Sequence, residues 1–252
     1  MLFLSNIDYL TLIQILIIFF VGGIVKGLIG VGLPTITLTL LSFLYDIKFS
    51  ISVILLPVVF TNLIQMLDGK YLLKIFNDVK VFLFSSFIFI VLGFYFLIIL
   101  NSKIILFFLA IILIVTSSLS IMKYELKIKN YKSKYFQFFI GSMTGIITGV
   151  TSIYTMPFIF LIQSLNYPKE KIIQLMGLTF FGFSSIQFIL FSFNGLINSE
   201  ILIFSLISCI PIFIGIYLGN ILRNKISENL FKYLLNIMIA LIGCLLIIKV
   251  IF

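Results

Sequence analysis

Two stretches rich in glycine and small polar residues hold the residue types that could bind a small anion. The first runs from Gly22 to Pro34 and contains one basic residue, Lys26. The second runs from Gly141 to Pro157 and has threonine and serine where the first has glycine. Glycine lets a helix break, and proline suits the first turn of a helix because no backbone N–H is needed there. Each stretch therefore predicts an unwound segment followed by a short new helix.

A helix that begins in this way is a ready anion site. Its N-terminus carries about half a positive charge and has free N–H donors. Two such helices that start near the middle of a membrane from opposite sides would converge on one substrate. The candidate substrate-binding residues in and beside the two breaks are Lys26, Gly27, Gly30, Gly32, Pro34, Thr35, Gly145, Gly149, Thr151, Ser152 and Pro157.

Polar side chains in two long apolar segments extend the candidate site. Amides and hydroxyls at membrane depth need hydrogen-bond partners, which can be the substrate or a neighbouring helix. The sequence leaves both possibilities open. These further substrate-binding candidates are Thr61, Asn62, Gln65, Ser184 and Gln187.

The glycines and the lysine also have purely structural interpretations. Glycines four residues apart, such as Gly23 with Gly27 and Gly145 with Gly149, are typical of close helix packing in membranes. Lys26 could extend its amine to the membrane surface. Neither alternative is excluded by the sequence.

Composition predicts an all-α polytopic membrane protein. Hydrophobic residues make up 62% of the 252 residues and charged residues only 10%, against about 25% in soluble domains. The net charge of +9 comes from basic residues in short loops, which is typical of loops beside anionic lipid rather than of nucleic-acid binding. There is no histidine, and the two cysteines have no metal-ligand spacing, so we expect no metal, no cofactor and no enzyme.

Hydropathy divides the chain into ten helical segments, five in each half. Residues at an offset of 122, as from Gly23 to Gly145, match repeatedly in glycine, glutamine, tyrosine and lysine. This predicts a first repeat over 1–122, a Lys-rich linker over 123–134 and a second repeat over 135–252. The segments over 34–45 and 153–165 are too short to span, as a crossing needs about 20 residues.

An odd number of segments per repeat inverts the second repeat relative to the first. Placing the linker in the cytoplasm puts most basic residues on that side, as expected for membrane proteins. Both termini then face outward from the inner membrane. Of the 17 Lys and Arg residues, only Lys48, Lys103 and Lys249 remain outside.

At these residues the sequence resembles the sulfite exporter TauE/SafE family of membrane transporters. The resemblance rests on the glycines from Gly23 to Gly32 with Pro34, on their echo from Gly141 to Pro157, and on Thr61-Asn62. It implies a transporter of small organic or inorganic sulfur anions in the inner membrane, with lipid and the anion as its partners. The second stretch departs from the glycine-rich pattern at Thr151–Tyr154.

Three functions are weighed on this basis, of which a non-transporting membrane assembly or enzyme partner fits poorly with the paired breaks. The first is a secondary transporter, an exporter of sulfite, thiosulfate or sulfonates, that works by alternating access of one repeat against the other. The alternative is a drug/metabolite-type carrier of neutral molecules, which would need full-length helices at the two short segments.

Overall fold

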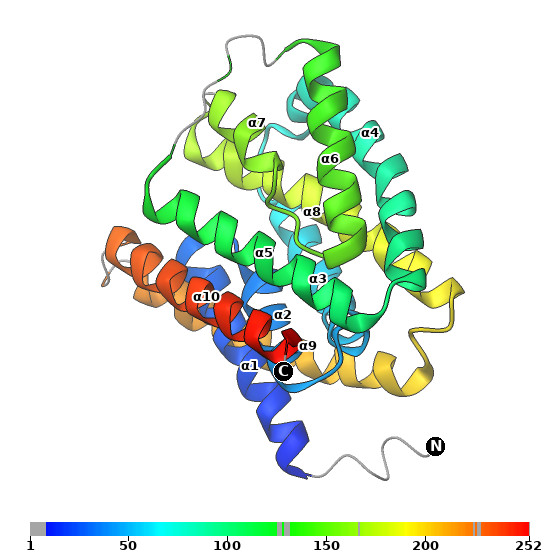
Figure 1. The fold of residues 1–252 in the computed structure, drawn as a ribbon. Helices are drawn as coiled ribbons and strands as arrows, with labels where there is room; N and C mark the ends of the chain where they lie inside the picture. Colours follow the sequence, from blue (N-terminus) through cyan, green and yellow to red (C-terminus); the bar gives the residue numbers. More distant parts are fainter. Residues whose placement is uncertain are drawn as a thin grey trace.

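The computed structural model describes residues 9–124, 128, 132–165, 167–223, 225 and 228–251. These residues form ten helices and no strand (Figure 1). Parts of the expected linker, residues 125–127 and 129–131, lie outside the described residues. The helices are α1 (Tyr9–Ile29), α2 (Leu33–Leu44), α3 (Ile47–Leu67), α4 (Leu72–Ile99), α5 (Ser102–Ile121), α6 (Lys134–Thr151), α7 (Phe158–Ser164), α8 (Lys169–Phe193), α9 (Ser199–Leu222) and α10 (Glu228–Ile251).

The number and order of helices confirm the all-helical prediction, with two boundary differences. The seventh helix begins at Phe158 rather than Ile153, because residues 152–157 form the connection that the proline ends. Hydropathy predicts a fourth segment over 79–100, but the helix begins at Leu72, so Asp78 lies inside it.

Helix length separates membrane-crossing helices from short ones. Within the described part of the chain, six helices are long and apolar enough to cross a membrane: α1, α3, α4, α5, α8 and α9. The short helices α2 and α7 have 12 and 7 residues, well below the roughly 20 that a crossing needs. The two short segments are therefore confirmed as short.

The long helices pack in pairs that join the two halves of the chain. The most extensive pairs are α4 with α6, α1 with α9, α3 with α8, and α5 with α10 (Figure 1). Each helix has a counterpart in the other half of the chain, five helices away. Exchanging both helices of the pair α1–α9 for their counterparts gives the pair α6–α4. The same exchange converts α3–α8 and α5–α10 into themselves. The core therefore lies between the two halves rather than within each.

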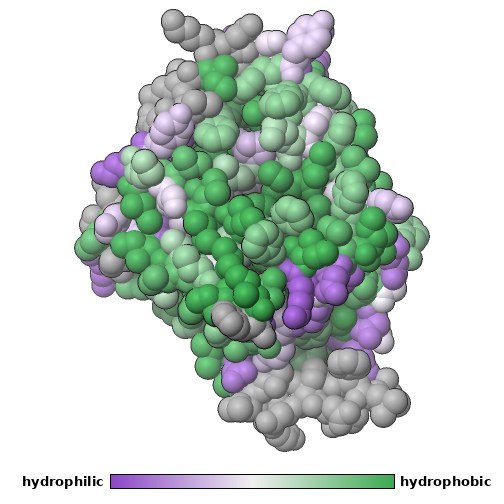
Figure 2. All heavy atoms as spheres, in the orientation of Figure 1, coloured by the Kyte–Doolittle hydropathy of each residue, from purple (hydrophilic) through white to green (hydrophobic). Residues whose placement is uncertain are grey.

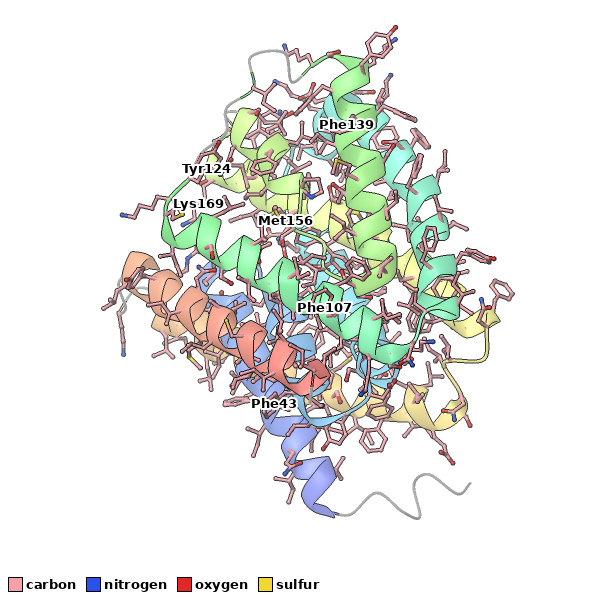
Figure 3. The ribbon with its side chains drawn as sticks, viewed as in Figure 1. Phe43, Phe107, Tyr124, Phe139, Met156 and Lys169 are labelled. Atoms are coloured by element: carbon pink, nitrogen blue, oxygen red, sulfur yellow. The ribbon has the colours of Figure 1, made fainter. Side chains whose placement is uncertain are left out.

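The outer surface is largely hydrophobic. Figure 2 shows apolar side chains over most of the face that α5, α6 and α10 form in Figure 1, with hydrophilic residues at its edges and in one group in the lower part of the view. Phe107 on α5 and Phe139 on α6 lie on this surface and are exposed (Figure 3). In water such a surface would cause aggregation, and in a bilayer it contacts lipid.

Candidate anion-binding site

The first break separates α1 from α2 at residues 30–32. Gly30 and Gly32 have φ angles of 87° and 98°, in the left-handed region that a side chain disfavours. Gly32 is the N-cap of α2, no side chain caps its N–H groups, and Pro34 follows in the first turn. Gly30, Gly32 and Thr35 are half-buried, so the break is not sealed by the surrounding helices. The prediction that α2 starts beside Pro34 is confirmed.

Lys26 turns toward the protein interior instead of the surface. Its amine Nζ donates to the Asn62 Oδ1 atom at 2.5 Å and to the Thr61 Oγ1 atom at 3.1 Å, both on α3. Lys26 is only 7% exposed, and Thr61 and Asn62 are buried as well. The alternative of a lysine extended to the membrane surface is therefore wrong.

In the described part of the chain, the Lys26 amine lacks a counter-ion, and the Asn62 amide beside it lacks a hydrogen-bond acceptor. Both acceptors of the Lys26 amine are neutral, and among the described residues no carboxylate lies within ion-pair distance of it. The Nδ2 atom of Asn62 is buried and has no hydrogen-bond partner. A buried cation and a buried N–H donor without acceptors are both costly. An anion at this position would satisfy the two together.

In the second break, between α6 and α7, hydrogen bonds to α8 and within the break occupy the polar groups. Gln187 on α8 donates to the Thr148 carbonyl at 2.8 Å and to the Ser152 hydroxyl at 2.9 Å. The Tyr154 hydroxyl donates to the Gln187 Oε1 atom at 3.0 Å. Thr151 caps the backbone, because its hydroxyl donates to the Ile147 carbonyl at 2.8 Å and accepts from the Ile153 N–H at 3.3 Å.

Aromatic rings enclose the same break. The Tyr154 ring centroid lies 5.5 Å from that of Phe180 and 5.9 Å from that of Phe183. Phe158, the first residue of α7, stacks on Phe82 of α4 at 4.8 Å. Thr151, Ser152 and Tyr154 are each at most 1% exposed. The polar groups of the second break are thus satisfied internally, in contrast to those of the first.

The remaining predicted residues fall into helix contacts. Gly27 lies against Gly219 of α9, and Gly145 and Gly149 lie against α4, so these glycines pack helices together. Gln65 donates to the Ile173 carbonyl on α8 at 2.9 Å, whereas Gln187 bonds to α6, so the two glutamines do not make equivalent contacts. The Ser184 hydroxyl donates to the Phe180 carbonyl of its own helix. Pro157 is the N-cap of α7.

The predicted residues therefore form two separate groups. One unites Lys26 with Thr61 and Asn62, and the other unites Ser152 with Gln187. No hydrogen bond among the described residues joins the two groups. The sequence did not single out Tyr154, because a tyrosine in an apolar stretch usually belongs to the core.

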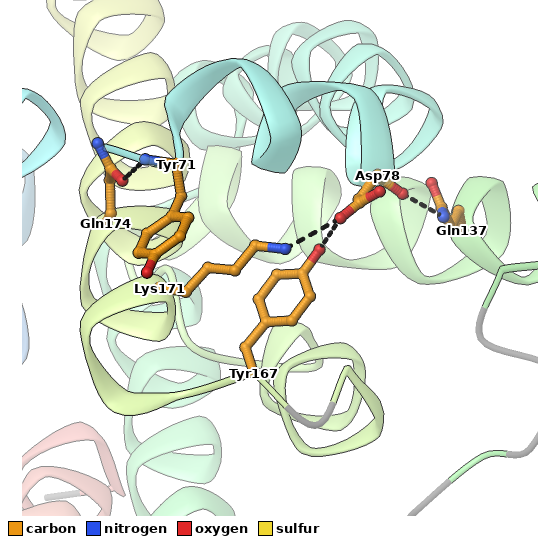
Figure 4. Close-up of polar contacts among 6 residues, drawn as sticks. All are labelled: Tyr71, Asp78, Gln137, Tyr167, Lys171 and Gln174. Atoms are coloured by element: carbon orange, nitrogen blue, oxygen red, sulfur yellow. Dashed lines mark hydrogen bonds and ion pairs between the residues drawn. The ribbon is translucent and has the colours of Figure 1, made fainter. Parts of the chain in front are cut away.

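A further polar cluster, not predicted from the sequence, joins α4, α6, α8 and the connection that precedes α8 (Figure 4). The Lys171 amine lies 3.1 Å from the Asp78 carboxylate and 3.3 Å from the centre of the Tyr167 ring. The Tyr167 hydroxyl donates to the same carboxylate oxygen, and Gln137 of α6 donates to the Asp78 carbonyl at 2.9 Å. Asp78 belongs to the first half and its partners to the second.

Comparison with known families decides the class of this protein. The family model for the sulfite exporter TauE/SafE matches residues 15–246, nearly the whole chain. The chain belongs to the TauE/SafE family. No curated protein and no solved structure matches it.

As a TauE/SafE member with six apolar membrane-spanning helices, the protein is a membrane transporter. The family match covers both breaks and all the residues around Lys26 and Gln187. It confirms the resemblance that the glycine pattern indicated.

Proposed function

We propose that this TauE/SafE chain exports small sulfur-containing anions, such as sulfite, thiosulfate or a sulfonate, and binds them at the first break. The observation that carries this proposal is the buried Lys26 amine, which has no carboxylate partner and lies beside the unpartnered Asn62 amide. Half-buried glycines and the uncapped start of α2 supply further N–H donors along the same segment. In this proposal the second break has a structural role, because its polar groups hydrogen-bond to α8 and to one another.

We further propose that transport proceeds by alternating access between two inverted repeats. The reciprocal pairs α1–α9 and α6–α4 support this, since a two-fold relation between repeats would generate one pair from the other. The alternative carrier of neutral molecules would have full-length helices where α2 and α7 have 12 and 7 residues. A neutral substrate would also leave the Lys26 charge without a counter-ion.

Flux of labelled sulfite into proteoliposomes tests this proposal. Wild-type protein should give saturable uptake, and Lys26→Met should abolish it while the protein stays monodisperse. Lys249→Met is the matched control, because Lys249 donates to the Phe43 carbonyl at the other end of α2, at 2.8 Å. Uptake that is lost equally in both variants, or in neither, would contradict the proposed site.

A further inference from the structure

The surroundings of Lys26 offer one positive charge and no negative one. Its two hydrogen-bond acceptors, on Thr61 and Asn62, are both neutral. The carboxylate of Asp78, on α4, pairs with Lys171 at 3.1 Å. Within the part of the chain that the structure describes, nothing else balances the charge of Lys26.

We propose that, among the anions of the proposed function, the first break selects by charge and prefers monovalent ones, such as bisulfite and monosulfonates, to divalent ones, such as thiosulfate. This inference rests on the proposed function, which assigns anion binding to this break. A monoanion neutralises the Lys26 amine, whereas a dianion leaves one negative charge uncompensated in surroundings of low dielectric constant. A neutral molecule leaves the amine itself unpaired, which is costly for the same reason.

The hydrogen-bond donors at the break suit such an anion. The Asn62 Nδ2 atom is the second donor beside the amine, and its side chain is 1% exposed. Its orientation is fixed, because the Oδ1 atom of the same amide accepts from Lys26 at 2.5 Å. The N–H groups at the start of α2 lack a side-chain cap. Two oxygen atoms on one sulfur would accept from the Lys26 amine and the Asn62 amide at once.

The second break does not supply the missing positive charge. Its position equivalent to Lys26 is Thr148, whose hydroxyl donates to the Ile153 carbonyl at 3.1 Å. The Gln187 amide is fully used by Thr148, Ser152 and Tyr154. A divalent anion would therefore find no second cation there.

Three molecules of the same tetrahedral shape separate charge from size. Dimethyl sulfone is neutral, methanesulfonate is a monoanion, and sulfate is a dianion. Their affinities for the purified protein are measured by isothermal titration calorimetry at constant ionic strength. We expect methanesulfonate to bind at least ~10-fold more tightly than either of the other two. Lys249→Met, at the far end of α2, should keep this order.

Two variants test whether Lys26 sets the preference. In Lys26→Met, methanesulfonate should lose its advantage over dimethyl sulfone. Asn62→Asp keeps Lys26 but supplies a counter-ion, and it should remove the same advantage even if Lys26→Met does not fold. Sulfate binding as tightly as methanesulfonate to the wild-type protein would overturn the charge selection and leave anion transport standing. Binding of none of the three, by a protein that also fails to transport sulfite, would overturn the proposed function and this inference with it.

Discussion

At Asn62 the two ends of one amide have different surroundings. The Oδ1 atom accepts a hydrogen bond from Lys26, and the Nδ2 atom has no partner. A buried donor without an acceptor costs about 1–3 kcal/mol. A bound anion would remove this cost by accepting a hydrogen bond from the Asn62 Nδ2 atom.

Substitution of Asn62 by aspartate should convert this site into an internal ion pair. In Asn62→Asp the carboxylate would neutralise Lys26 at hydrogen-bond distance and compete with the substrate. We expect at least a ~10-fold weaker affinity for methanesulfonate, with thermal stability equal to or above wild type. Calorimetry and a thermal unfolding curve in detergent measure the two. Unchanged affinity would show that the substrate does not need the charge of Lys26.

At this scale the sequence predicted residue types better than their partners. The sequence predicts Lys26 as the basic residue of the first break and Thr61 and Asn62 as polar residues at membrane depth, and the structure brings the three together. The contact of Gln65 with Ile173 on α8 was not predictable because the two residues lie 108 positions apart in the sequence. Tyr154 was missed because its hydroxyl finds its acceptor 33 residues away.

Helix crossings depend on glycines that allow backbones to touch. A Cβ atom at Gly149 would lie 2.4 Å from the Ile90 carbonyl oxygen and 2.7 Å from the Gly93 Cα atom. At Gly182 a Cβ atom would instead meet the end of the Phe87 ring, at 2.6 Å, which can move. Both are glycines within helices, but only one faces rigid backbone.

We therefore expect Gly149→Ala to destabilise the protein by about 1–3 kcal/mol, since α4 and α6 must move apart. Gly182→Ala is the matched control and should cost less, because the Phe87 side chain can rotate. The midpoint of thermal unfolding in detergent measures both. Equal losses would contradict the backbone contact between these helices.

The Asp78–Lys171 pair joins α4 to α8 across the two halves. Asp78 is 38% exposed, so solvent weakens the attraction. In a double-mutant cycle with Asp78→Asn and Lys171→Met, we expect a coupling free energy of about 0.5–1 kcal/mol in unfolding. Additive losses would mean that the two side chains act independently.

The helical elements could be predicted because apolar runs and glycine breaks are local signals. The start of α7 beside Pro157 follows from the proline, but the hydrogen bonds by which Gln187 of α8 holds Ser152 and Tyr154 could not be predicted from the sequence. The Asp78 cluster was not predictable either, since charged residues near helix ends usually face water. Here Lys171 is buried by packing between α4 and α8.

Across the whole molecule, most basic residues are expected on the cytoplasmic side. Two of the three expected on the outer side donate to the ends of helices. Lys48 donates to the Ile98 carbonyl at the end of α4, at 3.2 Å. Lys249 donates to the Phe43 carbonyl at the end of α2, at 2.8 Å. Lysines stabilise the negative C-terminal end of a helix. Their presence on the expected outer side therefore does not weaken the proposed orientation.

This orientation can be tested with exposed lysines on opposite sides. Lys103 lies at the start of α5, and Lys70 lies between α3 and α4. With Cys209 and Cys244 replaced by serine, we expect a membrane-impermeant maleimide to label Lys103→Cys in intact cells. Lys70→Cys should react only after permeabilisation. The opposite pattern would invert the proposed topology.

Equilibrium binding of labelled methanesulfonate to the purified protein tests the central claim most directly, with Lys26→Met and Tyr154→Phe compared in parallel. Tyr154→Phe removes the hydrogen bond to Gln187 in the second break. We expect it to lower thermal stability and to keep wild-type affinity, while Lys26→Met keeps its fold and loses binding. Wild-type affinity in Lys26→Met, or an equal loss in a folded Tyr154→Phe, would contradict an anion site at the first break.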